Sequence, residues 1–267
     1  MAVKVCILAS SSSGNCTFIS TGKTRILIDA GLSRKETFAR LEAIGEDPHQ
    51  LDAILISHEH CDHIAGLPVL AKKPKDRQKN QGWKQVPVYM TRLTAPQIDW
   101  GSCEPQLETF QAGAVFSIGD IGISTFTIPH DAIDPIGFCI KAEGRSIGIA
   151  TDLGYVTDSI RWHLRNTDFL LLESNHDIEM LKVGPYPWSV KQRVMGRMGH
   201  LSNEVAGQFI GQDLYEHTQT LVLGHLSEQN NYPDLVRLVA SQALEGRNLG
   251  TRLVVAEPKH RSDIFEL

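Results

Sequence analysis

Residues 58–63 read His-Glu-His-Cys-Asp-His and place several reactive side chains within six positions. Imidazole and carboxylate groups are good ligands for zinc and related divalent cations. The segment follows the apolar residues 53–56 and precedes the apolar stretch 64–71, so we expect it at the junction of a strand and a helix. A loop there can turn alternate side chains toward one point. The pattern therefore predicts a metal site, with the candidate ligands His58, His60, Asp62 and His63.

Three further candidate ligands stand at the ends of apolar runs later in the chain. His130 follows an Ile-Pro pair, Asp152 opens an Asp-Leu-Gly segment, and His225 follows a Leu-Gly pair. Each of these positions is expected at the end of a β-strand. This shared context favours a functional role for the three residues over chance positions on the surface.

The elements that must position these residues can be predicted from the apolar patterns and their flanking turn residues. Ser33 and Ser202 are expected to cap two of the helices. We expect strands over residues 3–9, 24–29, 53–56, 115–118, 121–128, 136–141, 146–151, 169–173, 220–223 and 252–256. We expect helices over residues 33–43, 64–71, 156–164, 177–182, 188–197, 203–214 and 232–244. Strands come first in runs and then alternate with helices, which fits two packed sheets with helices outside.

The overall charge excludes a protein that coats nucleic acids through general positive charge. The chain has 26 Lys and Arg residues against 31 Asp and Glu residues, a net charge of −5. Residues 72–84 differ, with six basic residues and one acid, and form either a solvated loop or a basic lip facing the substrate. No break in composition separates domains, so we expect residues 1–267 to form one domain.

The cellular compartment is indicated by the cysteines and by the apolar runs. The five cysteines are scattered and odd in number, which is typical of a reducing compartment. No apolar run approaches the ~18 residues of a membrane-spanning helix, and the first residues lack the pattern of a signal peptide. We therefore expect a cytoplasmic protein that does not contact a membrane.

The series of candidate ligands resembles the metallo-β-lactamase superfamily, whose hallmark is His-x-His-x-Asp-His. The resemblance implies an αββα sandwich, in which two mixed β-sheets pack face to face with helices outside. It also implies a site for two divalent metal ions, with Asp152 as the bridging ligand. Asp29 matches a family aspartate that orients the hallmark loop through hydrogen bonds. The first ion would be held by His58, His60 and His130, and the second by Asp62, His63 and His225.

Two ions of this kind, roughly 3.5–4 Å apart, generate hydroxide at neutral pH and stabilise an anionic transition state. Asp62 therefore counts among the expected catalytic residues as well as the ligands. Family members that act on thioesters and phosphodiesters carry aspartate at the position of Asp152, whereas the commonest β-lactamases carry cysteine there. Hydrolysis of antibiotics is thus disfavoured. A site of His and Asp ligands accepts Zn, Mn and Fe.

Glu173 and His200 narrow the reaction further. Glu173 ends an apolar run, and His200 lies in Gly-His-Leu-Ser-Asn at the start of a helix. This order resembles the transfer-RNA 3′-processing nucleases, in which a strand-end Glu orients a His that donates a proton to the leaving oxygen. A carboxylate-bound imidazole keeps its proton near neutral pH, as this role requires. The chain departs from those nucleases at Leu201 and Ser202, and His176 competes for the role of acid.

Residues 10–16, Ser-Ser-Ser-Ser-Gly-Asn-Cys, form a candidate site for phosphate oxygens, because hydroxyls and backbone N–H groups can receive them. With residues 173–176, 199–203 and 225–231, this segment resembles the YycJ/WalJ-like subgroup over essentially the whole chain. The subgroup is regarded as metal-dependent phosphodiesterases or exonucleases that act on DNA in the bacterial cytoplasm. The candidate phosphate contacts are Ser12, Ser13, Asn15, Asn175, His176 and Ser202.

The sequence therefore predicts a dinuclear-metal-dependent phosphodiester hydrolase, an exonuclease that cleaves DNA through a metal-bound hydroxide with His200 as general acid. Two enzymatic alternatives stay open: a phosphodiesterase for cyclic phosphates or nucleotide esters, and a thioester hydrolase of the same fold. A regulatory protein that only holds metal is disfavoured, because every ligand position is filled. A homo-oligomer is compatible with the sequence.

Overall fold

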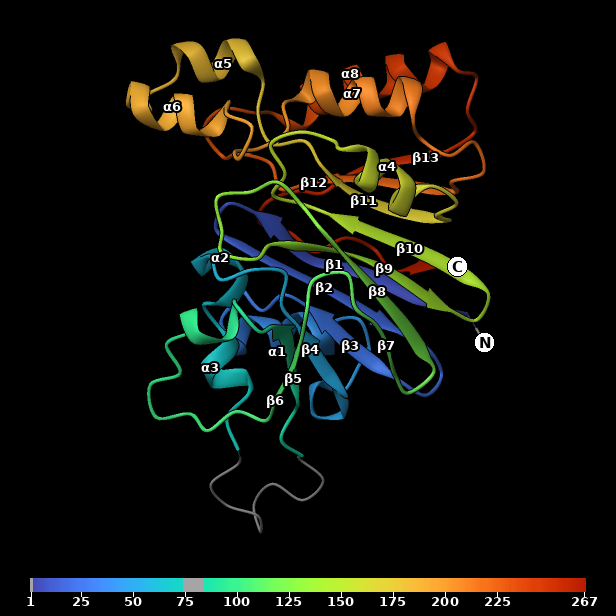
Figure 1. Ribbon diagram of the computed structural model, residues 1–267. Helices are drawn as coiled ribbons and strands as arrows, with labels where there is room; N and C mark the ends of the chain where they lie inside the picture. Colours follow the sequence, from blue (N-terminus) through green and yellow to red (C-terminus); the bar gives the residue numbers. More distant parts are fainter. Residues whose placement is uncertain (1, 74–83) are drawn as a thin grey trace.

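Two β-sheets packed face to face form the centre of the molecule, with helices on both outer faces (Figure 1). The computed structural model describes residues 2–73 and 84–267. The basic segment 72–84 thus lies almost entirely outside the described residues. Within the described part, fourteen strands form two sheets of seven. The predicted αββα sandwich of two mixed sheets is confirmed.

The first sheet has the strand order β14-β1-β2-β3-β4-β5-β6. The strands from β14 to β3 pair antiparallel, and those from β3 to β6 pair parallel. Consecutive parallel strands end at the same edge, so the loops after β3 and β4 are neighbours. The strands are β1 Lys4–Ser11, β2 Gly14–Ser20, β3 Arg25–Ile28, β4 Ala53–Leu55, β5 Val88–Thr91, β6 Leu107–Phe110 and β14 Phe265–Glu266.

The second sheet has the order β13-β12-β11-β10-β9-β8-β7. Its strands pair antiparallel from β7 to β10 and parallel from β10 to β13. The carboxyl ends of β10, β11 and β12 therefore lie side by side. The strands are β7 Val115–Ile118, β8 Ile121–Thr127, β9 Ile136–Ala142, β10 Arg145–Ala150, β11 Phe169–Glu173, β12 Thr220–Gly224 and β13 Arg252–Val255.

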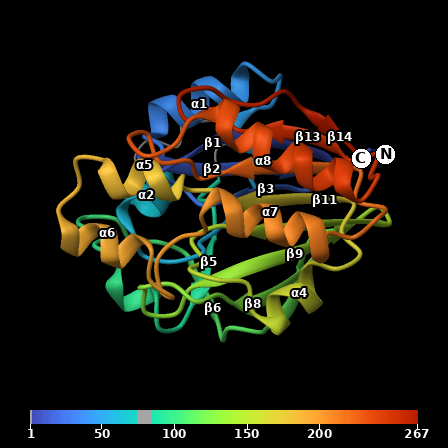
Figure 2. The same cartoon turned by 90° about the horizontal axis from the view of Figure 1, so that it is seen from above.

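The helices form the outer layers (Figure 1). The first sheet is covered by α1 Arg34–Glu42, α2 Cys61–Ile64 and α3 Leu67–Leu70, with the 3-10 turns Pro48–Gln50 and Ala95–Gln97. The second sheet is covered by α4 Asp158–Leu164, α7 Asn203–Gln212 and α8 Pro233–Gly246. Viewed from above, α5 Ile178–Val183 and α6 Trp188–Val194 lie together at one end of this layer (Figure 2). None of the helices in the described residues is long and apolar enough to cross a membrane.

Central strands are buried on both faces, which explains their continuous apolar runs. In β1, Val5 and Ile7 pack between the sheets, whereas the intervening Cys6 and Leu8 pack under the helices. Residues of β11 alternate in the same way between the inter-sheet core and the core beneath α4, α7 and α8. This tight packing leaves the loops at the strand ends as the place where polar residues can gather.

Several predicted boundaries were wrong. Strand β2 was missed because its Ser, Gly, Asn and Thr residues resemble a turn, yet all seven residues are buried between β1 and β3. The helix expected over 64–71 is instead the two short helices α2 and α3, and α2 begins inside the hallmark segment at Cys61. They are separated at Gly66, where a Cβ atom would overlap the carbonyl oxygen of Leu32. The close packing of this loop against α1 and β3 thus decides the local structure.

Candidate metal centre

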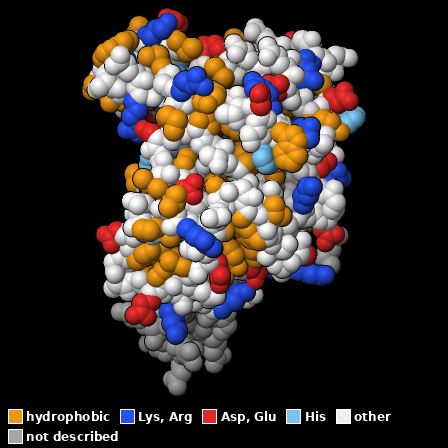
Figure 3. All heavy atoms as spheres, in the orientation of Figure 1, with side chains coloured by type: hydrophobic (Ala, Val, Ile, Leu, Met, Phe, Trp, Pro, Cys, Tyr) orange, Lys and Arg blue, Asp and Glu red, His pale blue; other side chains and the backbone are white. Residues whose placement is uncertain are grey.

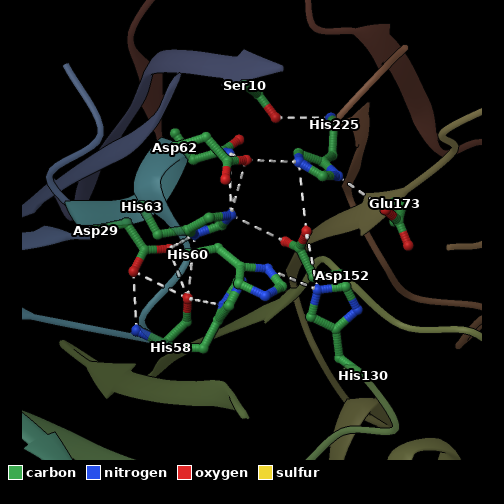
Figure 4. Close-up of polar contacts among 12 residues, drawn as sticks. Ser10, Asp29, His58, His60, Asp62, His63, His130, Asp152, Glu173 and His225 are labelled. Carbon is green, nitrogen blue, oxygen red and sulfur yellow. Dashed lines mark hydrogen bonds and ion pairs between the residues drawn. The ribbon is translucent and has the colours of Figure 1, made fainter. Parts of the chain in front are cut away.

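The loops after β4, β8, β10 and β12 bring the predicted ligands together at one edge of the sandwich (Figure 4). They form two groups, in each of which one donor atom per residue lies within 4.8 Å of all the others. The first sheet supplies the hallmark residues 58–63, and the second sheet supplies the other ligands. The groups are His58, His60 and His130, and Asp62, His63, Asp152 and His225.

Asp152 lies between the two groups. Its Oδ2 is 3.2 Å from Nε2 of His63, and its Oδ1 is 3.4 Å from Nε2 of His225. The same Oδ1 lies 3.9 Å from Nε2 of His130, which belongs to the other group. One carboxylate thus faces donor atoms of both groups, the position that a bridging ligand needs.

Three residues of the site adopt a left-handed backbone conformation. The φ angles are 62° at Asp29, 60° at Asp152 and 56° at His225, and each residue follows directly or closely on a strand. Such angles are uncommon outside glycine and cluster at functional sites, where the surrounding structure enforces them. Here the sharp turns direct the side chains of Asp152 and His225 toward the common centre, and that of Asp29 toward the hallmark loop (Figure 4).

Hydrogen bonds fix which ring nitrogen each imidazole turns to the centre. The Nδ1 atom of His63 donates to Asp29 Oδ2 at 2.8 Å, and that of His225 donates to Glu173 Oε1 at 2.8 Å. Nδ1 of His130 donates to the carbonyl oxygen of Gly199 at 3.1 Å. In each case the hydrogen bond of Nδ1 turns Nε2 toward the centre, where Nε2 would be the ligand atom for an ion. Outer partners of this kind commonly orient histidine ligands of metal ions.

His58 tests whether the donor set fits a metal ion. Its Nε2 atom is buried and has no hydrogen-bond partner among the described residues. Burial, with the neighbouring His63, holds the pKa of His58 well below its ordinary value, so the ring is neutral. A buried lone pair without a partner is unfavourable in a folded protein. Because this lone pair faces other imidazoles and the carboxylate of Asp152, the residues fit divalent metal ions.

Asp29 lies behind the hallmark loop and is hydrogen-bonded to it. Its carboxylate accepts hydrogen bonds from the backbone N–H of Ser57 at 2.8 Å and from the Ser57 hydroxyl at 2.9 Å. The Ser57 oxygen lies 3.0 Å from Nδ1 of His58, which donates to it. Sequence reasoning missed Ser57, although a small hydroxyl residue directly before the first hallmark histidine is a readable signal.

Glu173 is completely buried at the end of β11 and joins two imidazoles. Its Oε1 accepts hydrogen bonds from Nδ1 of His200 at 2.7 Å and Nδ1 of His225 at 2.8 Å. Its Oε2 accepts from the backbone N–H groups of Leu153 and Leu201, each at 3.0 Å. Burial alone would raise the pKa of Glu173, but the charges and hydrogen bonds of the two histidines lower it to about 2. The carboxylate is therefore ionised.

His200 and His176 differ in their ability to carry a proton. Burial lowers the pKa of His200, but the charge and hydrogen bond of Glu173 outweigh it and raise that pKa above its ordinary value. Burial lowers the pKa of His176 to about 4, and its Nδ1 has no hydrogen-bond partner among the described residues. The two rivals for the role of acid are thus an imidazole held by a carboxylate and one kept neutral by burial.

The candidate phosphate contacts Ser12 and Ser13 form the turn between β1 and β2, and Asn15 lies in β2. Ser12 and Ser13 are exposed, and the Ser13 hydroxyl donates to Glu228 Oε1 at 2.7 Å. Asn15 is buried instead, and its Nδ2 donates to Asp62 Oδ2 at 3.1 Å. Its amide thus holds a candidate ligand in place, while contact with phosphate stays a prediction.

The other candidate phosphate contacts are engaged within the protein. Nδ2 of Asn175 donates to the carbonyl oxygen of His225 at 2.8 Å, and Ser202 caps α7 as predicted. Ser10, whose role was missed, accepts a hydrogen bond from the backbone N–H of His225 at 2.8 Å. Since Ser10 lies in the first sheet and His225 follows a strand of the second, this bond ties the two sheets together beside the site (Figure 4).

Comparison with known proteins identifies the family to which this fold and this ligand cluster belong. Residues 24–225 match the family described as the β-lactamase superfamily domain, which is more than half of the chain. The chain belongs to this superfamily. The fold is also that of the metallo-β-lactamase fold protein YhfI from Bacillus subtilis, with a TM-score of 0.72 and 18% identity over 98% of this chain and 99% of that one.

Two curated relatives resemble the chain over nearly its whole length. It is 37% identical to the exodeoxyribonuclease WalJ of Streptococcus pneumoniae, over 92% of this chain and 90% of that protein. It is 35% identical to the exodeoxyribonuclease YycJ of Bacillus anthracis, over 94% of this chain and 92% of that protein. The resemblance to this subgroup that the sequence motifs indicated is confirmed.

Proposed function

We propose that this protein is a metal-dependent exonuclease that hydrolyses phosphodiester bonds of DNA in the cytoplasm. The main support for this proposal is the hydrogen bond between the buried Glu173 and His200, which holds the imidazole directly beside the ligand cluster. The names of the two relatives, both exodeoxyribonucleases, support DNA as the substrate and cleavage from an end. They lend no support to the alternatives of a small-molecule phosphodiesterase or a thioester hydrolase.

The ligand set supports two divalent ions, with zinc or manganese as the candidates and iron as a third choice. His58, His60 and His130 would hold one ion, Asp62, His63 and His225 the other, and Asp152 would bridge them. When bound, such ions activate water and stabilise the negative charge that develops on the phosphate. Asp29 and Asn15 keep His63 and Asp62 in place for this task.

His200 would donate the proton that the leaving oxygen requires. Its Nδ1 is held by Glu173 at 2.7 Å, so the transferred proton leaves from Nε2. The side chain is 17% exposed, whereas Glu173 is completely buried, so His200 can meet a substrate and Glu173 cannot. Glu173 thereby acts as a positioning residue, and its ionised carboxylate stabilises the protonated imidazole. Proton donation of this kind contributes roughly 10²–10⁴-fold to the rate.

The proposal is tested by assaying several substrates with each of two metals. Metal-stripped protein receives Mn or Zn and is assayed on end-labelled single-stranded DNA, double-stranded DNA, RNA and bis-p-nitrophenyl phosphate. We expect metal-dependent release of nucleotides from DNA ends. Turnover of the small diester without any cleavage of DNA would reject the nuclease, and failure on every substrate with both metals would reject the hydrolase.

A further inference from the structure

The segment from residue 180 to residue 203, which we call the α5–α6 arm, differs in charge from the rest of the chain. It contains Lys182, Lys191, Arg193 and Arg197 and no Asp or Glu, within a protein of net charge −5, although the first turn of α5 adds Glu179, which pairs with Lys182 at 2.7 Å. Lys191 is buried, where its Nζ donates to the carbonyl oxygen of Lys182, and the other three basic side chains are exposed. The basic groups still outnumber the acidic ones on this surface, and such a surface attracts a polyanion.

The arm also exposes large apolar side chains. The exposed fraction is 62% for Trp188, 85% for Val183 and 50% for Met198, and Met195 is exposed to 37%. Figure 3 shows hydrophobic and basic side chains together at the upper left, where Figure 1 draws α5 and α6. Gathered apolar surface beside basic groups is typical of an interaction site and not of a merely solvated face.

The carboxyl end of the arm is built into the candidate metal centre. The N–H of His200 donates to the carbonyl oxygen of Val194 in α6, and the guanidinium of Arg193 pairs with Asp131 at 2.6 Å. The backbone of Arg197 packs on Gly154, where a Cβ atom would overlap its carbonyl group. A strand whose phosphate reaches His200 therefore has the arm as its neighbour.

Arg197 is a cation poised to bind phosphate at this junction. Its guanidinium lies 4.3 Å from the centre of the Tyr155 ring, three residues after Asp152. No carboxylate partner for Arg197 occurs in the described residues. Trp188 is the first residue of α6, and Arg197 lies three residues beyond the last residue of that helix, Val194.

We infer that the α5–α6 arm binds an unpaired stretch of the DNA strand that is being cleaved. The face of Trp188 stacks on a nucleobase, and Arg197 binds a phosphate between that base and the metal centre. An exposed aromatic ring beside cations is the arrangement that binds single-stranded nucleic acid without sequence preference. In a duplex the base faces are already stacked on one another, so the geometry favours the single strand. This inference rests on the proposed exonuclease function and specifies its substrate.

Binding is measured with the full-length, metal-loaded protein and a fluorescent phosphorothioate dT oligonucleotide, which resists cleavage. We expect Trp188→Ala to weaken the affinity about tenfold or more, because loss of one stacked base has effects of this size. Trp188→Phe should retain most of the affinity, since its ring still stacks. The matched control is Trp162→Ala on α4, which removes a tryptophan of similar exposure, 57%, at the other end of the helical layer; it should bind like the parent protein.

A second variant tests the phosphate contact independently of the ring. Arg197→Gln should weaken binding and reduce the slope of log affinity against log salt by roughly 0.7, the value for one phosphate contact with a single strand. Equal affinity of Trp188→Ala and the parent protein would overturn the inference, as would equal losses for single-stranded and double-stranded oligonucleotides. If the parent protein digests DNA while both variants bind normally, the inference fails and the proposed function stands. If the parent protein neither binds nor digests DNA, both fail.

Discussion

Two buried carboxylates flank the candidate metal centre, one from each sheet, and they support it differently. Asp29 follows β3 of the first sheet, and Glu173 ends β11 of the second (Figure 4). Each accepts a hydrogen bond from Nδ1 of a candidate ligand, His63 for Asp29 and His225 for Glu173. In this respect the two halves of the site mirror each other.

The remaining partners break the symmetry. Asp29 accepts its other hydrogen bonds from Ser57, which directly precedes the hallmark ligands. Asp29 therefore holds the loop that carries these ligands. Glu173 instead holds His200, which belongs to neither predicted ligand set. We infer that Asp29 supports metal binding alone, whereas Glu173 supports both metal binding and proton donation. The following substitutions test this division, from the largest expected effect to the smallest.

Asp152→Ala removes the carboxylate that lies between the two halves. We expect both DNA cleavage and turnover of bis-p-nitrophenyl phosphate to fall by about 10³-fold or more, since the metal contribution is worth several kcal/mol. Elemental analysis should show reduced metal content. Asp234→Ala, which removes an exposed carboxylate on α8, serves as control and should keep full activity. Retention of either activity by Asp152→Ala would contradict the bridging role.

His200→Ala removes the candidate acid from the Glu173 side. DNA cleavage should slow by roughly 10²–10⁴-fold, because the alkoxide leaving group needs a proton. Bis-p-nitrophenyl phosphate should be turned over at nearly the parent rate, because its leaving group departs without one. The exposed His217 offers a matched control in His217→Ala. Undiminished DNA cleavage by His200→Ala would make the general-acid role wrong, and His176 would be tested next in the same assay.

Glu173→Gln keeps the shape of the side chain but removes its charge. The variant should repeat the asymmetry of His200→Ala in weaker form, with a loss of about 10–100-fold on DNA. The reason is that the imidazole of His200 stays in place but loses the charge that raises its pKa. The ratio of the two activities is the measurement. Equal losses on both substrates would show that Glu173 acts only through His225.

Asp29→Asn should show no such asymmetry. We expect a loss of about 10–100-fold in metal affinity, since His63 and Ser57 lose the carboxylate that orients them. Both activities should fall together and recover together when excess metal is added. Titration of metal-stripped protein measures this directly. A selective loss on DNA that metal does not restore would place Asp29 in proton donation and erase the difference from Glu173.

The ligand cluster could be predicted from sequence because each ligand lies in a short, recognisable sequence pattern. The hallmark occupies six consecutive positions, and His130, Asp152 and His225 each follow a recognisable strand. Hydrogen bonds between distant residues left no such signal. Asn15, for example, reaches Asp62 across 47 positions. The same limit hid the roles of Ser10 and the strand β2, whose polar composition is explained only by burial between β1 and β3.

The origin of the ligands in both sheets has a consequence for the lifetime of the protein. Residues 58–63 come from the first sheet, and His130, Asp152 and His225 come from the second. Ions held between them would fasten the two sheets, and binding would then favour the folded state by thermodynamic linkage, by about 2.7 kcal/mol at a free metal concentration of a hundred times Kd. Metal starvation would then lower the amount of intact protein as well as its catalytic rate, because the loosened chain is a better target for proteolysis.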